Sequence, residues 1–360
     1  MNDTTSAVQI TALTIPASVE DADAADFIEM TRVRNLIYAE IDGNDDEAHT
    51  PAELLPHYAD DPDEIRLMWL IRVGGEIVGR VGVDLPLEED STVAFWLIEI
   101  LRAHHGRGIG SLAYELVERT AREHGRITLQ SWATHPDASG DHLEPPTGFG
   151  SIPRDHAARF YERHGYALGQ VERKSALDLT VDPDRIDALF ADAETAAAGY
   201  RVVQWLLPTP PELAEGYAWA KSRMSTDTPA GTMEFDEEEW DAERIARHDQ
   251  RYLDGGQTVL VTAAIHEESG TVVAFNELVR PAEETAATSQ EDTLVLKEHR
   301  GHRLGMLVKT AGIRRWREVS PRSPRIITYN AEENRPMLDI NEAIGFVPVA
   351  YGGAWKKMLS

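Results

Sequence analysis

The chain has 360 residues, and its 62 acidic side chains against 35 lysines and arginines give a formal net charge of -27. Such a charge argues against nucleic-acid binding, which needs a basic surface. The absence of cysteine excludes disulfides, thiolate metal sites and a cysteine nucleophile. Hydrophobic residues make up 42% of the chain, and its length suits two domains of about 180 residues.

The N-terminal segment lacks the basic start and apolar core of a targeting sequence. No apolar run approaches the roughly 20 residues that a membrane span needs. We therefore expect a cytoplasmic protein that makes no membrane contact.

The first 90 residues predict a strand, a helix and a hairpin. Residues 8–16 are rich in β-formers, and residues 24–40 have helical spacing. Residues 66–73 and 76–83 flank Gly74-Gly75, which is the signal of two antiparallel strands joined by a tight turn.

A glycine-rich turn then joins a strand to a helix. The strand is expected over residues 93–101 and the helix over residues 111–124. Glycines at 106, 108 and 110 let a ligand approach the backbone, and the N–H groups that open the helix suit an anionic group such as pyrophosphate. Taken alone, the same glycines also fit an ordinary strand-to-helix connection.

The rest of this half contains a strand at residues 127–132, a helix ending at Gly165, a closing strand at residues 172–181 and a connecting helix at residues 185–198. The loop over residues 135–155 holds several potential metal ligands without any fixed spacing. We expect a solvated or substrate-covering loop and no metal there; the residues concerned are His135, Asp137, Asp141, His142 and Glu144.

Residues 200–206 open a second set of elements with a strand, followed by a helix at residues 208–224. Residues 225–246 are strongly acidic, above all from Glu234 to Glu239, and we interpret them as a solvated face that has a lesser chance of guarding a substrate entrance. The next hairpin is expected at residues 257–266 and 271–280.

The glycine-rich turn occurs a second time. Strand residues 293–296 lead to His299-Arg300-Gly301-His302-Arg303-Leu304-Gly305, a helix to Val319, a strand at residues 325–329 and the segment 334–346. Gly305 follows Gly110 by 195 positions, and Gly345 follows Gly165 by 180. A repeat of this length indicates two similar domains.

Each pair of segments resembles the GCN5-related N-acetyltransferase (GNAT) family. Its donor motif reads Arg/Gln-x-x-Gly-x-Gly/Ala, and its later segment reads roughly Asn-x-x-Ala-x-x-Phe-Tyr-x-x-x-Gly-Phe. The first copy matches the later segment at Ala157, Phe160, Tyr161 and Gly165, but has His105 for Arg and Arg154 for Asn. The second copy keeps Arg300 and Asn334, but has Arg303 for the middle glycine and no Tyr.

The resemblance implies an α/β (α+β) fold of two tandem GNAT domains, each with a mixed, mostly antiparallel sheet flanked by helices. We expect the N-terminal domain at residues 1–182, a linker at 183–199 and the C-terminal domain at 200–360. It further implies acetyl-CoA as acyl donor. The donor-binding residues carried over are Ile100, Leu101, Arg102, His105, Gly106, Arg107, Gly108, Ile109, Gly110, Ser111, Val295, Leu296, Arg300, Gly301, His302, Arg303, Leu304, Gly305, Met306 and Asn334.

Acetyl transfer needs a base for the amine and benefits from an acid at the leaving thiolate. The resemblance gives the acid role to Tyr161, while Asn341 at the matching position cannot donate a proton; Tyr329 and Tyr351 are substitutes from other elements. We take Glu99 as the candidate base of the first copy, although strand alternation also lets its side chain face water. Further candidates in the second copy are Glu277 and Asp292.

An acidic surface with basic residues only at the two turns favours a small cationic amine as acceptor, although solubility or a high-salt habitat would explain the charge equally. The function predicted is N-acetyl transfer to that amine by a monomer or homodimer. Two alternatives remain: a mycothiol-synthase-like acetyltransferase, and a regulator that binds acyl-CoA or a metabolite without turnover.

Overall fold

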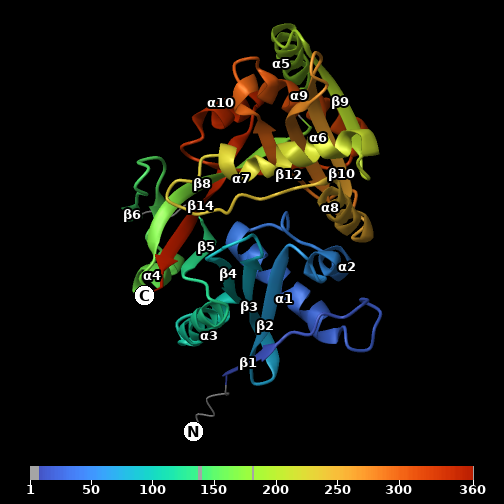
Figure 1. Ribbon diagram of the computed structural model, residues 1–360. Coiled ribbons are helices and arrows are strands. Elements are labelled where there is room, and N and C mark those ends of the chain that lie inside the picture. The colour runs from blue at the N-terminus through green and yellow to red at the C-terminus, as the bar shows by residue number, and fades with distance from the viewer. Residues whose placement is uncertain (1–7, 137–139, 181, 360) are drawn as a thin grey trace, which may run out of the picture.

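The computed structural model describes residues 8–136, 140–180 and 182–359. They form two α/β halves, one above the other in Figure 1. We call residues 8–180 the first half and residues 182–359 the second half. None of the described helices is long and apolar enough to span a membrane.

The first half contains, in chain order, β1 (Val8–Ala12), α1 (Ala25–Asp42), α2 (Pro51–Leu54), η1 (Leu55–Tyr58), β2 (Glu64–Val73), β3 (Glu76–Pro86), β4 (Val93–Ile100), η2 (Arg102–His104), α3 (Ile109–Glu123), β5 (Thr128–His135), β6 (His142–Leu143), β7 (Ile152–Pro153), α4 (His156–Arg163) and β8 (Ala167–Asp178). The second half contains α5 (Pro183–Ala196), β9 (Tyr200–Leu206), α6 (Pro211–Ser222), α7 (Met224–Asp227), α8 (Ala242–Asp254), β10 (Thr258–His266), β11 (Val272–Arg280), β12 (Thr288–Val295), η3 (Lys297–His299), α9 (Leu304–Val319), β13 (Arg325–Ala331), α10 (Arg335–Ile344) and β14 (Val347–Met358).

Most predicted elements are present within a few residues of their expected bounds, and α8 and β14 are the longest elements that the sequence did not predict. Helix α8 begins inside the run that we interpreted as solvated; Ile245 and Asp249 are its buried residues, so its apolar pattern is weak. Strand β14 follows the last predicted helix. The mixed α/β architecture itself agrees with the prediction.

Twelve strands form one continuous sheet in the order β1-β2-β3-β4-β5-β14-β8-β13-β12-β11-β10-β9. Each half gives its last strand to the other: β14 lies between β5 and β8, and β8 pairs with β13. Within this sheet, neighbouring strands are antiparallel except for β4 with β5 and β12 with β13. The exchange makes the two halves one structural unit.

Helices cover both faces of the sheet in the same way in each half. His135, Tyr351, Arg173 and Asn330 lie side by side on four neighbouring strands, so their side chains share one face. His135 contacts Asp155, the N-cap of α4, and Asn330 contacts Asn341 of α10. Helices α4 and α10 therefore cover the same face.

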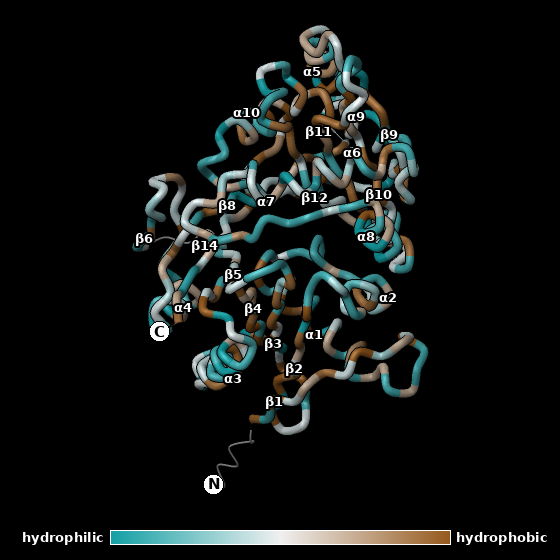
Figure 2. The backbone as a smooth tube through the Cα atoms, in the orientation of Figure 1, coloured by the Kyte–Doolittle hydropathy of each residue, from teal (hydrophilic) through white to brown (hydrophobic). Residues whose placement is uncertain are grey.

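The opposite face carries α1 and α6. Lys174 and Tyr329, which pair on β8 and β13, point away from α10 and reach the end of α1. Figure 2 shows hydrophobic residues concentrated in the strands and hydrophilic ones along the segment that crosses between the halves. The cores lie between sheet and helices, and the polar seam lies where α1 and α6 approach each other.

Candidate functional site

A candidate donor site opens where β4 and β5 separate. The strands pair only from Val93 to Phe95 and from Thr128 to Gln130, and we call the opening beyond these residues the first splay. The turn after β4 leads into α3, with Gly108 as N-cap in the left-handed conformation (φ 78°). The first N–H groups of a helix have no intrahelical partner and carry the positive end of its dipole, which suits a phosphate.

The second half repeats this geometry. Strands β12 and β13 pair from Thr288 to Gln290 and from Ile326 to Thr328, and we call the opening beyond them the second splay. Arg303 precedes α9 with φ 56°, so a non-glycine residue adopts the conformation that Gly108 has in the first half. Replacing the middle glycine of the motif therefore leaves the turn intact.

His105 and Arg300 occupy equivalent places and make equivalent bonds. The Nε2 atom of His105 lies 2.8 Å from the carbonyl oxygen of Ile100, and Nε of Arg300 donates to the carbonyl oxygen of Val295 at 3.2 Å. Both side chains thus tie the turn back to the strand five residues earlier. The histidine in the first copy replaces the arginine in this bracing role, and backbone N–H groups of both turns are left to meet a ligand.

The other predicted donor-binding residues lie around these turns. Arg102 is the exception, because its backbone N–H donates to Glu40 at 2.8 Å and its guanidinium also bonds Glu40 of α1. Gly110 and Gly305 are needed for helix packing: an added Cβ would lie 3.1 Å from Phe160 or 2.9 Å from Ile340. The remaining residues end β4 or β12, form the turns or open α3, α9 and α10: Ile100, Leu101, Gly106, Arg107, Ile109, Ser111, Val295, Leu296, Gly301, His302, Leu304, Met306 and Asn334.

Tyr161 lies at the vertex of the first splay. Its hydroxyl is 2.8 Å from Oγ of Ser131, the first residue of β5 beyond the paired stretch. Its ring stacks on Trp355 of the exchanged strand β14, with centroids 4.8 Å apart and planes 5° from parallel. Burial raises the pKa of Tyr161 well above its usual value, so the hydroxyl keeps its proton at neutral pH.

Glu99 lies on the α1 face of the sheet. Nε of Arg80 donates to its carboxylate at 2.6 Å, and the Tyr38 hydroxyl donates at 3.0 Å. Burial alone would raise the pKa of Glu99, but the charge and hydrogen bond of Arg80 outweigh it and lower the pKa. Glu99 is thus held as an ionised partner of Arg80, which makes it a poor proton acceptor.

The second half has different side chains at the equivalent points. Asn341, in the place of Tyr161, accepts from Nζ of Lys309 at 2.6 Å and donates to Oδ1 of Asn330 at 2.7 Å. Lys309 of α9 is 0% exposed. Burial lowers its pKa to about 7.

The vertex of the second splay carries an acid that sequence reasoning missed. Glu291 follows Gln290, the last β12 residue paired with β13, and occupies a bulge between β11 and β12. Its side chain is exposed, but desolvation by the surrounding protein, followed by the charges of Asp292 and Glu277, raises its pKa to about 7. A bulge is the one local signal for it, and bulges commonly re-aim a side chain next to an active site.

The two predicted bases of the second half are engaged elsewhere. Nζ of Lys221 on α6 lies 2.9 Å from carboxylate oxygens of both Glu277 and Asp292. Glu277 also accepts from the hydroxyl of Tyr217. Glu291 is therefore the carboxylate of this cluster with the pKa suited to taking a proton near neutrality.

Each half covers the other's splay. Residues 43–50, which we call the crossing loop, bring Glu47 to 2.8 Å from the Tyr329 hydroxyl and 2.8 Å from Nζ of Lys174. Asp42, just before the loop, also accepts from Lys174 at 2.8 Å. A wall of the second splay is thus supplied by acidic residues of the first half.

Residues 228–241, which we call the strap, run from α7 to α8 across the first half (Figure 1). Nε2 of Gln130 donates to the carbonyl oxygen of Glu234 at 2.6 Å, and the backbone N–H of Glu234 donates to Oε1 of Gln130 at 2.7 Å. Phe235 stacks on Phe95 of β4. The expectation of a merely solvated acidic face is corrected: most of these side chains are exposed, but the segment is anchored on Gln130 and Phe95 beside the first splay.

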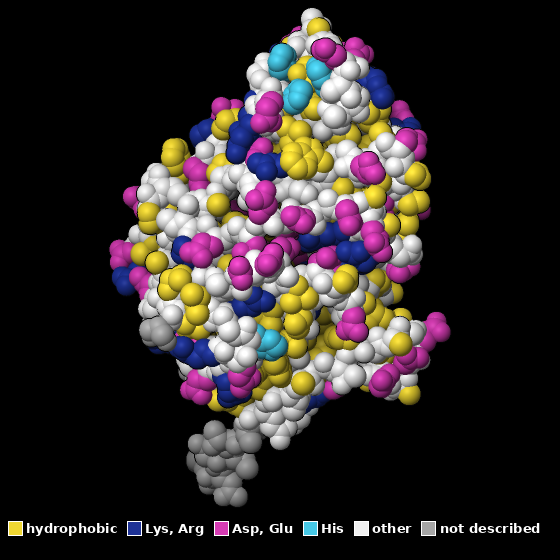
Figure 3. Space-filling model, viewed as in Figure 1, with side chains coloured by type: hydrophobic (Ala, Val, Ile, Leu, Met, Phe, Trp, Pro, Cys, Tyr) yellow, Lys and Arg dark blue, Asp and Glu magenta, His cyan; other side chains and the backbone are white. Residues whose placement is uncertain are grey.

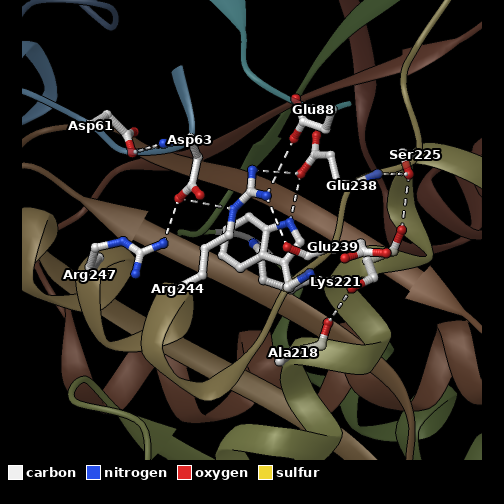
Figure 4. Close-up of polar contacts among 12 residues, drawn as sticks. Asp61, Asp63, Glu88, Ala218, Lys221, Ser225, Glu238, Glu239, Arg244 and Arg247 are labelled. Carbon is white, nitrogen blue, oxygen red and sulfur yellow. Dashed lines mark hydrogen bonds and ion pairs between the residues drawn. The ribbon is translucent and has the colours of Figure 1, made fainter. Parts of the chain in front are cut away.

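Helix α8 fixes the strap against the first half. Arg244 lies between Asp63, Glu88 and Glu238 at 3.4–3.5 Å and stacks over Trp240 (Figure 4). These residues border a cavity of about 240 Å³ between the halves. Figure 3 shows a band of acidic and basic side chains along this hollowed seam.

In the 135–155 loop, Asp137 lies outside the described residues. His135 is fully buried and contacts Asp155 at 3.0 Å, a helix-capping pair rather than an open ligand set. The described part of the chain contains no group of three or more His, Asp or Glu side chains placed to hold a metal.

Residues 30–140 match the model of the Acetyltransferase (GNAT) family. This stretch of the first half is therefore similar to a GNAT acetyltransferase domain. The fold of the whole chain is similar to that of a tandem GNAT protein from the clavulanic acid biosynthesis pathway, which aligns over 98% of both chains with 22% identity and a TM-score of 0.73. A GCN5-related N-acetyltransferase from Sphaerobacter thermophilus aligns over 98% of this chain and 95% of its own, with 16% identity and a TM-score of 0.59.

No curated protein matches the sequence. The structural neighbours share the fold. The family whose model matches residues 30–140 consists of acetyltransferases that generally use acetyl-CoA.

Proposed function

We propose that the protein transfers the acetyl group of acetyl-CoA to the amine of a small cationic molecule, and that the amine binds in the seam beside Glu291. The observation that carries this proposal is the position of Glu291: it lies at the vertex of the second splay, among other carboxylates, and has a pKa of about 7.

Acetyl-CoA fits both turns. The N–H groups opening α3 and α9 would hold its pyrophosphate, and Arg107 and Arg303 supply positive charge beside them. The bound donor supplies the activated acetyl group as a thioester. With its phosphates at a turn, its acyl arm reaches the adjoining splay.

Attack requires a neutral amine. A cationic acceptor must lose a proton, and Glu291 is ionised in about half of the molecules at pH 7 because its pKa is about 7. A base with a pKa near the working pH is often ionised and still binds a proton strongly enough to remove it from the amine. We propose that Glu291 takes one proton from the cationic form before the neutral nitrogen attacks the acetyl carbon, and that the second proton, lost as the amide forms, passes to solvent.

The charge of the seam favours a cation. Around the second splay, Lys174 and Lys221 face more carboxylates than they neutralise, since each is paired with two acids and Glu291 is additional. The acids come from both halves. They are Asp42, Glu47, Glu277, Glu291 and Asp292.

The first splay is the second candidate site. Its supporting observation is the hydroxyl of Tyr161 at the vertex, where it would protonate the leaving thiolate, with Glu99 on the opposite face as the predicted base. The ion pair of Glu99 with Arg80 and the strap anchored over Phe95 argue for a donor-binding role of this half rather than turnover.

A screen of amines tests the proposal. Acetyl-CoA-dependent release of the CoA thiol would be measured with polyamines, aminoglycosides and amino sugars, beside matched neutral and carboxylated compounds. We expect cationic amines to give the highest kcat/KM, falling as salt shortens the Debye length below about 10 Å. A salt-independent kcat/KM, or preference for neutral acceptors, would contradict the charge argument.

The same screen separates an enzyme from a regulator. Binding of acetyl-CoA with no thiol release for any amine, in wild type and at pH values on both sides of 7, would favour a protein that holds acyl-CoA or a metabolite without turnover. Release that disappears in Glu291→Gln would favour the enzyme.

A further inference from the structure

Three polar side chains form a buried chain behind the second splay. Nζ of Lys309 donates to Oδ1 of Asn341 at 2.6 Å, and Nδ2 of Asn341 donates to Oδ1 of Asn330 at 2.7 Å. Lys309 is 0% exposed and Asn341 is 1% exposed, whereas Asn330 is only half-buried. The chain therefore begins in the core and ends near the surface of the sheet.

The hydrogen bond from Lys309 sets the direction of the whole chain. Nζ of Lys309 carries N–H donors whether or not it is protonated, and it donates to Oδ1 of Asn341, so Asn341 turns its nitrogen toward Asn330. Asn330 must then accept with its oxygen. The Nδ2 group of Asn330 is then available as a hydrogen-bond donor, and the side chain that carries it is half-buried.

Asn330 stands beside the reacting region of the second half. It lies on β13 two residues beyond Thr328, the last residue paired with β12. In the first half Tyr161 meets Ser131 of β5 at the equivalent point of its splay. A different set of side chains thus occupies the place of the predicted proton donor.

We propose that the amide of Asn330 donates a hydrogen bond to the departing sulfur of CoA, with Lys309 and Asn341 as positioning residues that hold the amide in this orientation. This inference rests on the proposed function, because it places turnover in the second half.

The chemistry needs no acid at this position. The C–N bond forms as the amine nitrogen attacks the acetyl carbon, the C–S bond breaks, and its electron pair stays on sulfur. The cationic amine gives one proton to Glu291 before attack, and the second proton, lost by the nitrogen as the amide forms, passes to solvent. A thiol with a pKa of about 8.5 leaves readily as a thiolate when an N–H group faces it, so Asn330 replaces proton transfer by hydrogen bonding.

Three substitutions test the chain in the intact protein. Asn330→Ala removes the donor and should lower kcat by roughly 10²-fold, the usual effect of losing one such group, without changing KM for acetyl-CoA. Asn330→Asp should be slower still, because a carboxylate repels the thiolate. Lys309→Met keeps the volume but frees the amides to rotate, and should also lower kcat.

The double variant Lys309→Met with Asn330→Ala separates positioning from mere stability. We expect its kcat to equal that of Asn330→Ala alone, because both changes remove the same hydrogen bond. Tyr114→Phe, at the equivalent position of α3 in the first half, serves as the control and should leave kcat unchanged.

Each result has a distinct meaning. Unchanged kcat in Asn330→Ala, or an Asp variant as fast as Ala, overturns the inference, as does a double variant whose losses multiply. If Glu291→Gln abolishes thiol release while Asn330→Ala does not, the proposed function stands and only the inference fails. If Glu291→Gln is fully active, the proposed function itself fails.

Discussion

The first half has a tyrosine four residues before the glycine that ends α4, and the second half has an asparagine four residues before the glycine that ends α10. The carboxylates on the other face of the sheet differ in the opposite sense: Glu99 of the first half is paired with Arg80, whereas Glu291 of the second half has a pKa of about 7. In the proposed assignment, the first half has the proton donor and the second half has the base. The comparison teaches that a motif match locates the donor turn, while the ion pairs around each splay decide which half can accept a proton.

The sharpest way to break this comparison is a pair of matched substitutions. Glu291→Gln removes the base and should lower kcat/KM for the amine by about 10²-fold or more. Tyr161→Phe should change it by no more than a few-fold, because the first half lacks a free base. Steady-state kinetics with saturating acetyl-CoA measures both; the opposite ranking would move turnover to the first half.

The pH profile sharpens the same assignment. Glu291 must be ionised to take a proton, so kcat/KM should rise as pH increases through about 7. In Glu291→Gln, the residual kcat/KM should no longer rise through this pH range. If the rise persists in that variant, the titrating group is the amine or another residue.

The strand exchange predicts that the halves unfold together. Trp355 of β14 is 1% exposed and stacks on Tyr161 of the first half, so Trp355→Ala should cost about 3–5 kcal/mol of stability. The matched control is Trp219→Ala, since Trp219 is 57% exposed and should matter little. Calorimetry should show one transition, lowered in the first variant; two separate transitions would mean that β8 and β14 do not couple the halves.

The two turns are compared directly by charge substitution. Gly108→Glu and Arg303→Glu each place a carboxylate at a left-handed N-cap where pyrophosphate would bind. We expect two acetyl-CoA sites per chain in the wild type, and a loss of roughly 100-fold in affinity at one site in each variant, because like charges repel. Titration calorimetry counts the sites; a silent Arg303→Glu variant would show that the second turn does not bind the donor.

The sequence predicts the turns and the helices well because their signals are local. Gly108 and Gly345 mark left-handed positions at the ends of helices, and the apolar spacing of α3 follows from one buried face. Strand exchange has no local signal. The residues of β14 do not indicate from which half its neighbours come, and only the packed sheet shows that Trp355 stacks on Tyr161.

The site residues that the sequence could not give depend on contacts across the seam. Glu291 sits in an acidic run that suits a surface strand, and only the bulge and the neighbours Asp292 and Glu277 show its role. In the same way, the residues around Glu99 in the sequence do not reveal whether its carboxylate is free or paired. Its ion pair with Arg80 joins residues 19 positions apart, which no short motif records.

A final comparison is between two carboxylates whose pKa values shift in opposite directions. Burial is the main cause that raises the pKa of Glu172 on β8 to about 7. A hydrogen bond with Trp132 lowers this pKa, and the charge of Glu333 raises it. A raised folded pKa means that the ionised form destabilises the fold: the stability is greatest below the usual value near 4.5 and is lost as pH rises through 7. Glu99 has a lowered pKa, so its contribution is present at neutral pH and is lost on acidification.

Glu172→Gln should therefore stabilise the protein at pH 8 by about 1–3 kcal/mol and have little effect at pH 5, because the wild-type side chain is then mostly protonated. Glu99→Gln should destabilise it at pH 8 by about 3–5 kcal/mol, since Arg80 is left buried without its partner. Urea unfolding at both pH values measures the two differences. A Glu172→Gln variant that is less stable at pH 8 than the wild type would mean that the ionised carboxylate is stabilised in the seam, and the acidic seam would then be a weaker attractor for a cationic amine than its net charge suggests.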